Sequence, residues 1–160
     1  MDDGANLFTE SWDSTRDGVH VAGVGRRAGS EQLGASVWEI APGAAQAQLH
    51  VHYANEEMIV VLAGTPTLRT LEGTRDLAPG DVVACPRGRS GAHCLENRSE
   101  EVARVLIVST MTMPEVVAYP EGDNLFVMTQ PPFSDVEDES ADRILRVFHR
   151  PEGRPIPPDR

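Results

Sequence analysis

Between residues 33 and 110, the sequence is a series of short stretches with β-strand patterning, and this pattern constrains the fold most strongly. In the first stretch, Ser36, Trp38 and Ile40 occupy alternate positions, which is the two-residue period of a strand. Turn-forming residues such as Pro79-Gly80-Asp81 separate the stretches about every eight to twelve residues, and no convincing helix interrupts them. The pattern predicts an all-β sandwich or barrel, and a jelly roll would build one without long open edges.

The residue pattern divides the chain into three segments. These are an N-terminal arm (residues 1–32), a barrel core (residues 33–112) and a C-terminal extension (residues 113–160). The polar arm is expected to carry one short strand near residues 19–24, with a frayed terminus as an equal alternative. In the extension, residues 114–119 and 125–129 have strand patterns, and residues 143–150 fit a short helix or a last strand. The acidic residues 134–142 and the proline-rich end are expected to be surface chain.

The charge and the cysteine content exclude several classes of protein. A net charge of -11 argues against binding nucleic acid or an anionic membrane, because both require a basic surface. No apolar run approaches the ~20 residues of a membrane span, and the acidic start MDDGANLFTE does not resemble a signal peptide. Two cysteines give no disulfide framework, so we expect a cytoplasmic protein, and the composition hints at a bacterial source. The chain has no lysine, which excludes Schiff-base chemistry.

Two histidines and a glutamate form the first part of a candidate metal site. His50 and His52 are two residues apart, so in a strand they point to the same face. Glu57 lies on the following strand, where its parity with inward apolar residues selects it over Glu56. Imidazoles and a carboxylate that share one face are ligands of the nitrogen and oxygen type that transition metals accept.

A second block, Gly80–Asn97, supplies a further histidine, His93. A turn at Pro79-Gly80 and a glycine-bearing loop flank its strand, so the chain is expected to double back. An antiparallel return would bring His93 opposite the strand that carries His50 and His52.

The two blocks together resemble the paired motifs of the cupin superfamily, over residues 34–112. The matching positions, in motif order, are Gly43, His50, His52, Glu57 and Gly64 in the first block, and Gly80, Pro86, Gly88, His93 and Asn97 in the second. The chain looks like a small single-domain bacterial cupin, which implies a double-stranded β-helix, or jelly-roll barrel. The resemblance implies that His50, His52, Glu57 and His93 bind one divalent metal, which is Fe, Mn, Ni, Co, Cu or Zn. Four protein ligands on a six-coordinate ion would leave two positions open for water, substrate or dioxygen.

The chain departs from the motif pattern in two spacers. The spacer before His50 is one residue longer than the usual five, and four residues rather than two separate Gly88 from His93. The second departure lies in the loop that places the last ligand, and Gly91 is expected to give that loop the freedom to absorb the insertion.

The remaining polar and aromatic residues are assigned mainly to structural roles. His20 and His149 are interpreted as non-ligands, Asn97 as a turn former, and Cys85 and Cys94 as packed or outward side chains. Trp38 and Ile40 are assigned to the core in preference to the pocket mouth. Tyr53 and Arg69 are secondary candidates for polar pocket residues, and an inward Arg69 would favour a carboxylate-bearing substrate.

Three functions remain open at this stage. The first is a metal-dependent enzyme that acts on a small polar molecule, such as a carboxylate or a sugar, by dioxygenase or isomerase-type chemistry, with its catalytic groups unknown. The second is a non-catalytic module that binds or senses a small molecule, although the 32 residues before the barrel are too few for a helix-turn-helix domain. The third is an architectural subunit with an empty pocket. We further expect a homodimer, because single cupin barrels tend to pair and the arm offers a means.

Overall fold

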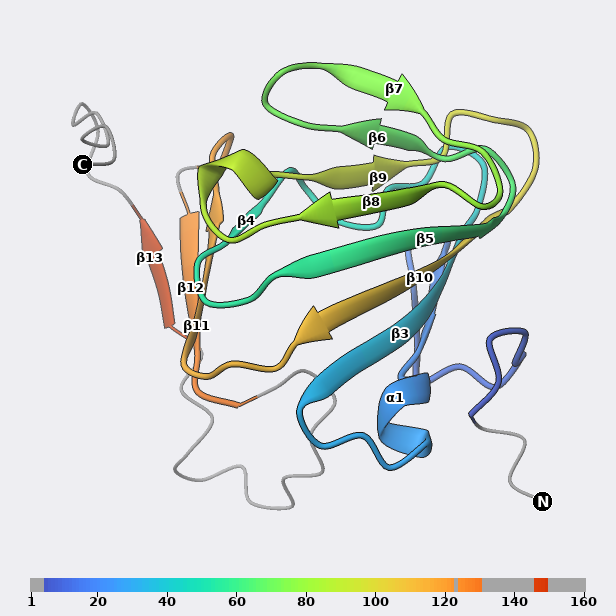
Figure 1. Cartoon of the computed structure of the whole chain (residues 1–160). Helices are drawn as coiled ribbons and strands as arrows, with labels where there is room; N and C mark the ends of the chain where they lie inside the picture. The colour runs from blue at the N-terminus through green and yellow to red at the C-terminus, as the bar shows by residue number, and fades with distance from the viewer. Residues whose placement is uncertain (1–4, 123, 131–145, 150–160) are drawn as a thin grey trace.

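The computed structural model describes residues 5–122, 124–130 and 146–149, with the side chains of the last range left aside. Within these residues the chain is almost entirely antiparallel β-structure, so the predicted all-β class is confirmed (Figure 1). The acidic segment 134–142 and the proline-rich end predicted from the sequence lie outside the described residues. No helix in the described part of the chain is long and apolar enough to cross a membrane.

One layer of the barrel is a six-stranded antiparallel sheet in the order β1-β2-β3-β10-β5-β8. Its strands are β1 (Ser14–Arg16), β2 (Val19–Ala22), β3 (Leu33–Ile40), β10 (Ala103–Thr110), β5 (Glu57–Ala63) and β8 (Val82–Cys85). The long strand β10 lies between β3 and β5. The first and last strands of the barrel core, β3 and β10, are therefore neighbours in the sheet.

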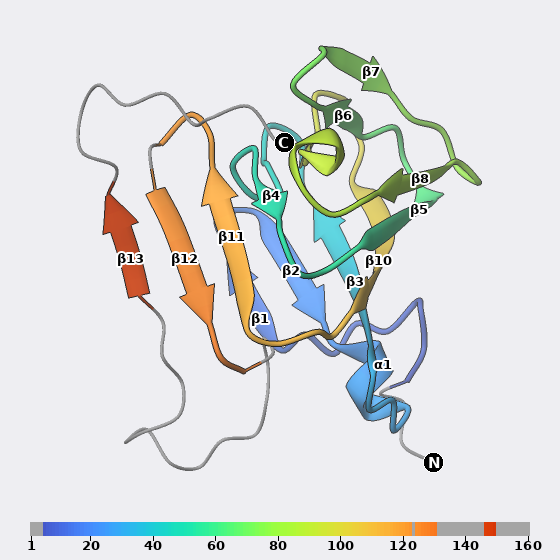
Figure 2. The same ribbon diagram turned by 60° about the vertical axis from the view of Figure 1, so that its left-hand side comes forward.

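The opposite layer consists of two smaller sheets that meet at the candidate site. One has the order β13-β12-β11-β4, with β13 (Arg146–His149), β12 (Asn124–Met128), β11 (Glu115–Tyr119) and β4 (Val51–His52). The other has the order β7-β6-β9, with β7 (Thr74–Asp76), β6 (Thr67–Arg69) and β9 (Cys94–Glu96). An isolated antiparallel bridge between His50 and His93 joins the two sheets. Figures 1 and 2 show β11 to β13 gathered at one end of the barrel, next to β4.

The main core fills the space between the six-stranded sheet and the β7-β6-β9 sheet. Its fully buried side chains include Ile40, Ile59, Leu95 and Val105, each from a different strand. Burying apolar side chains of this size stabilises a fold by about 1.5–3 kcal/mol each. The strands are therefore held together independently of any ion.

The strand β1 in the arm and two short helical turns are the elements that the sequence did not indicate. The helix α1 (Val24–Arg27) follows β2, and a 3₁₀ turn (Arg89–Gly91) precedes the strand β9. A single turn is too short to show a helical period, so periodicity cannot reveal it. The strands expected from the sequence were otherwise found, with ends shifted by one or two residues, and residues 146–149 form a strand rather than a helix.

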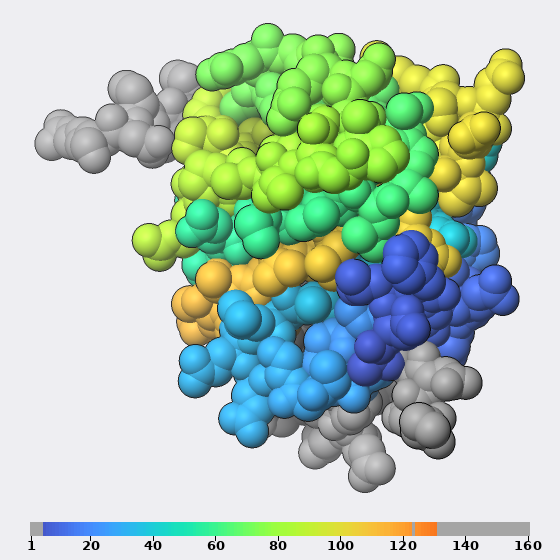
Figure 3. Space-filling model, turned by 45° about the vertical axis from the view of Figure 1, so that its right-hand side comes forward, coloured from blue at the N-terminus to red at the C-terminus, as the bar shows by residue number. Residues whose placement is uncertain are grey.

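The N-terminal segment lies on the outside of the six-stranded sheet. Strands β1 and β2 extend this sheet past β3, and Leu7 and Trp12 pack over Val37. The Arg104 guanidinium donates hydrogen bonds to the carbonyl oxygens of Leu7 and Thr9, and it also contacts the Trp12 ring. Figure 3 shows this segment, in dark blue, lying against the outer surface.

The first-motif glycine Gly64 is required by a close backbone approach. Its φ is +74°, and a Cβ atom there would lie 2.6 Å from the carbonyl oxygen of Val102. Glycine therefore allows β5 to end tightly against the start of β10.

Candidate metal centre

Four side chains from three parts of the barrel converge on one point. His50 directly precedes β4, His52 lies on it, Glu57 begins β5, and His93 directly precedes β9. Each of the four offers one ligand atom, and these atoms all lie within 4.8 Å of one another. The chain thus brings all four residues predicted from the sequence together in a cluster that can hold a metal ion.

Backbone pairing accounts for the meeting of the two motif blocks. The N–H group of His50 donates to the His93 carbonyl over 3.1 Å, and the N–H group of His93 donates back over 3.0 Å. The two residues are therefore directly opposed across an antiparallel bridge, and their rings lie 4.5 Å apart between centroids. The predicted doubling-back of the second block explains this geometry.

Two of the histidine rings are oriented by backbone carbonyls. His50 Nδ1 lies 2.8 Å from the Gln48 carbonyl oxygen, and His93 Nδ1 lies 2.9 Å from that of Gly91. Because a carbonyl only accepts hydrogen bonds, each Nδ1 carries a proton, and in the neutral ring each Nε2 has a lone pair to offer an ion. The Nε2 atom of His93 is buried and lies next to the Glu57 carboxylate, which places two candidate ligand atoms side by side.

Glu57 supplies the negative charge of the cluster. Its Oε2 atom lies 3.0 Å from His93 Nε2 and 3.5 Å from His52 Nε2. Burial opposes ionisation of Glu57, but the neighbouring histidines outweigh burial and lower the pKa of the carboxyl. Its neighbour Glu56 is exposed, which confirms the assignment made from strand parity.

The three imidazoles do not have the same electrostatic environment. Burial, together with the neighbouring rings of His93 and His52, lowers the pKa of His50 to about 4, so this ring is neutral. Burial also opposes charge on His93, but the Cys85 thiol and the Glu57 carboxylate raise the pKa of His93 to about 10. In the absence of an ion, a proton on His93 balances the charge of Glu57, and a metal would replace that proton.

A second glutamate, Glu115, was not identified from the sequence. It is 1% exposed, and its Oε2 atom lies 3.6 Å from His52 Nδ1. The backbone N–H groups of Tyr53 and Ala54 donate to its Oε1 atom, and the Asn55 amide donates to Oε2. These contacts fix the carboxylate behind the His52 ring, where the other two histidines have a carbonyl.

The loop before His93 is shaped by a steric constraint. Gly91 has no positive φ, but a Cβ atom at this position would lie 1.7 Å from the Pro86 carbonyl oxygen. Glycine is therefore needed for contact within the loop, rather than for the conformational freedom expected from the sequence. The Gly88 N–H group donates to the His52 carbonyl over 2.7 Å, which ties the same loop to β4.

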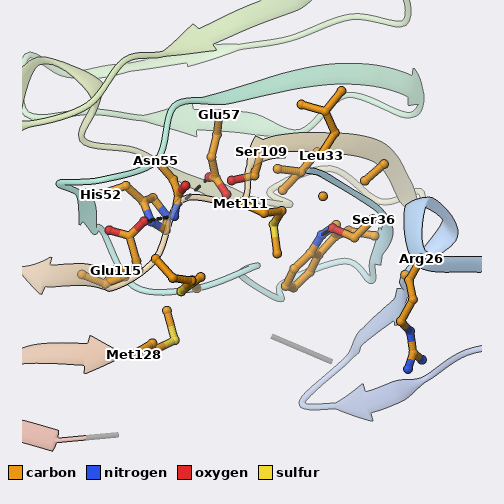
Figure 4. Close-up of a pocket in the computed structure, with 18 of the residues that line it drawn as sticks. Arg26, Leu33, Ser36, His52, Asn55, Glu57, Ser109, Met111, Glu115 and Met128 are labelled. Carbon is orange, nitrogen blue, oxygen red and sulfur yellow. Dashed lines mark hydrogen bonds and ion pairs between the residues drawn. The ribbon is translucent and has the colours of Figure 1, made fainter. Parts of the chain in front are cut away.

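The cluster forms one side of a cavity of about 480 Å³ between the six-stranded sheet and β11 (Figure 4). In Figure 4, His52, Asn55, Glu57 and Glu115 lie close together, and Met111 lies between this group and Leu33. The volume falls within the range of small-molecule sites. Tyr119 also lines the cavity, and burial raises the pKa of its phenol, so its hydroxyl group keeps its proton.

The two secondary candidates for polar pocket residues, Tyr53 and Arg69, lie outside the cavity. Tyr53 is 46% exposed and does not line it, and Arg69 instead pairs with Glu121 and Glu96 on the surface. Neither secondary candidate lies in the cavity, because the sequence around a polar residue gives no sign of which distant neighbour it will meet. Trp38 packs against the main core, as preferred from the sequence, and it also lines the cavity, which was the alternative.

The structural assignments fit the observed contacts. Ile40 is buried in the core, and Cys85 lies in the same apolar cluster. The Asn97 side-chain amide donates to the carbonyl of Ile40, which is a structural role. The His20 ring forms a hydrogen bond with the Thr15 hydroxyl on the neighbouring strand β1, and it is not in the cluster.

Comparison with known proteins gives matches to one family. The family model of the cupin domain matches residues 36–109, and no curated protein matches the chain. The structure resembles that of a sugar phosphate isomerase from a cupin superfamily of Silicibacter pomeroyi, which is 28% identical, with a TM-score of 0.68 over 80% of this chain and 84% of that chain.

Two further structures show the same fold at lower identity. A protein from Acidithiobacillus ferrooxidans is 22% identical, with a TM-score of 0.72 over 86% of this chain and 80% of its own. The polyketide cyclase RemF from Streptomyces resistomycificus is also 22% identical, with a TM-score of 0.52 over 59% of this chain and 66% of its own. At this identity the likeness extends to the fold alone.

Proposed function

The chain belongs to the cupin superfamily, and from this premise we propose that it is a metal-dependent enzyme acting on a small molecule that carries adjacent oxygen atoms. The observation that carries the proposal is the set of four convergent donor atoms on the wall of a cavity. Three imidazoles and a carboxylate suit any of the divalent ions Fe, Mn, Ni, Co, Cu or Zn. A bound ion would supply Lewis-acid polarisation of a substrate oxygen or activation of dioxygen.

The residues around the cluster have complementary roles in this proposal. His50, His52 and His93 would each present Nε2 to the ion, and Glu57 a carboxylate oxygen. The carbonyl partners of His50 and His93 hold those rings in one tautomer, which lowers the cost of assembling the site. Tyr119, with its retained proton, is suited to donate a hydrogen bond to a substrate oxygen in the cavity.

Two reaction classes are supported by different observations. The Silicibacter pomeroyi protein, described as a sugar phosphate isomerase, supports an isomerase-type reaction, because the match extends over most of both chains. The apolar lining of much of the cavity, including Trp38 and Met111, supports a dioxygenase instead, since dioxygen and apolar substrates favour such surroundings. The non-catalytic binding module is the alternative to both.

Elemental analysis of freshly purified protein, followed by two assays of the natively loaded form, tests the proposal. We expect about one equivalent of a divalent transition metal per chain. Isomerisation of hydroxycarbonyl compounds without oxygen uptake would identify an isomerase, and substrate-dependent oxygen uptake a dioxygenase. Stoichiometric metal with ligand binding but no turnover in either assay would overturn the enzyme proposal in favour of a binding module.

Replacing Glu115 by glutamine is expected to weaken metal binding by about 10–100-fold, which is the usual effect of losing a partner behind a ligating histidine. Glutamine keeps the shape and can still accept from the Tyr53 and Ala54 N–H groups, but it has no charge to offer His52. Competition with a chromogenic chelator measures the dissociation constant. Glu56→Gln, an exposed change beside the site, is the matched control and should leave the constant unchanged. Equal constants for both variants would show that Glu115 has no part in metal binding.

A further inference from the structure

The cavity next to the candidate metal site is chemically divided. At one end Asn55 and Glu115 lie beside the ligands, and at the other end the lining includes Arg26, beyond Ser36. Much of the remaining lining is apolar and includes large side chains from four parts of the chain, namely Leu33, Trp38, Ile107, Met111, Met113 and Met128. A ligand that extends from the cluster therefore meets polar groups at the metal end and a largely apolar surface between that end and Arg26.

Trp38 presents an apolar face because its one polar atom is already engaged. The indole N–H group donates to the Ser36 hydroxyl oxygen over 2.8 Å. Ser36 also lines the cavity, and this bond engages the only polar atom of Trp38, while the Ser36 hydroxyl can still donate its own proton. An aromatic surface with its N–H satisfied favours contact with another ring or an alkyl chain.

Met111 has a defined position against β3. A Cβ atom added at Gly34 would lie 2.5 Å from the Met111 sulfur, so the glycine leaves the space in which this side chain lies. Gly34 has no positive φ, and alanine is therefore compatible with its backbone but not with the present position of Met111. The width of the apolar part of the cavity thus depends on this contact.

The charges that line the cavity do not favour a phosphate. Among the described lining residues, Arg26 is the only cationic side chain apart from the histidines, and Glu31, Glu57 and Glu115 are acidic. Recognition of a phosphate dianion normally uses several donors or cations around one point. The side-chain amide oxygen Oε1 of Gln46, by contrast, is buried without a hydrogen-bond partner among the described residues, and Gln46 lines the same cavity, so this atom can accept from a ligand hydroxyl or N–H group.

We propose that the ligand of this site is an amphipathic molecule, with a pair of oxygen atoms at the metal end and a ring-sized apolar body against Trp38 and Met111. The metal end rests on the function proposed above, whereas the apolar body rests on the cavity lining. A sugar phosphate, with hydroxyl groups along its length and a dianionic end, does not have this character.

Calorimetry with two hydroxamates tests the apolar body on zinc-loaded protein. Acetohydroxamate and benzohydroxamate chelate through the same two oxygen atoms, but the first carries a methyl group where the second carries a phenyl ring. We expect benzohydroxamate to bind at least about 10-fold more tightly, since the ring would be removed from water.

Gly34→Ala should displace Met111 and reduce this ratio of affinities towards one, with metal content and acetohydroxamate binding retained. Met58→Ala, on the exposed face of β5, should leave the ratio unchanged. Equal binding of the two hydroxamates, or tighter binding of ribose 5-phosphate, would overturn the proposal.

A second measurement does not depend on the metal. In metal-free protein labelled at the methionine methyl groups, phenol should shift the resonances of Met111, Met113 and Met128, which line the cavity, and not that of Met58. Failure of both hydroxamates to bind, with these shifts present, would contradict the metal-dependent function but retain the apolar site. Absence of the shifts, or an equal shift at Met58, would overturn the apolar site itself.

Discussion

His93→Ala protein is expected to bind its metal at least about 100-fold more weakly than the parent chain, since even changes behind a ligand cost 10–100-fold. His93 is the ligand that the second motif contributes, and its Nε2 atom lies 3.0 Å from Glu57. Removing the ring leaves the carboxylate and two imidazoles, so the ion loses one of its four protein ligands. His50→Ala should have the same effect. Metal per chain after gel filtration, measured by mass spectrometry, gives the result.

The fold should survive this change, because the apolar core does not include His93. The far-ultraviolet circular dichroism of the variant is expected to match that of the parent chain. His20→Ala is the matched control, since this histidine lies outside the cluster and should leave metal content unchanged. Unchanged metal stoichiometry in both the His50 and the His93 variants would contradict the assignment of the site.

Gly91→Ala is expected to destabilise the metal-free protein by about 3 kcal/mol, at the upper end of the usual cost of overpacking. The new methyl group would lie 1.7 Å from the Pro86 carbonyl oxygen, so the backbone of the loop must move. The Gly91 carbonyl also orients the His93 ring, and metal binding should therefore weaken with stability. Urea unfolding in the presence of a chelator measures the first effect, and metal competition the second.

The same substitution at Gly122 provides the control. Its added Cβ atom would make only ordinary contacts, the nearest at 3.4 Å to the Asn124 amide, and its φ is not positive. Gly122→Ala should change the free energy of unfolding by no more than about 0.5 kcal/mol. If Gly91→Ala were equally mild, the loop would not have the close packing described here.

The ligands and the barrel could be predicted from the sequence because their signals are local. The spacing of His50 and His52 fixes a common face, and parity along β5 selects Glu57. Turn residues mark the strand ends, so the antiparallel return that carries His93 also follows from the sequence. Apolar alternation placed Ile40 in the core for the same reason.

The support for His52 could not be predicted because it depends on a long-range pairing. Val117 pairs with His52 across β11 and β4, and this register places Glu115 near the same ring. The alternation of Glu115, Val117 and Tyr119 was a usable sign that all three share a face. Nothing local, however, indicated that this face would close over the site, and the apolar lining of the cavity was unpredictable for the same reason.

X-ray absorption at the edge of the native metal tests the proposed site most directly. The Cys85 thiol lies beside His93, so the method can separate a nitrogen and oxygen ligand set from one that includes sulfur. We predict one divalent ion per chain, with three imidazole nitrogens and a carboxylate oxygen in its inner shell and no sulfur. A shell of sulfur atoms at about 2.3 Å from the metal, or a purified protein without stoichiometric metal, would contradict the proposed site.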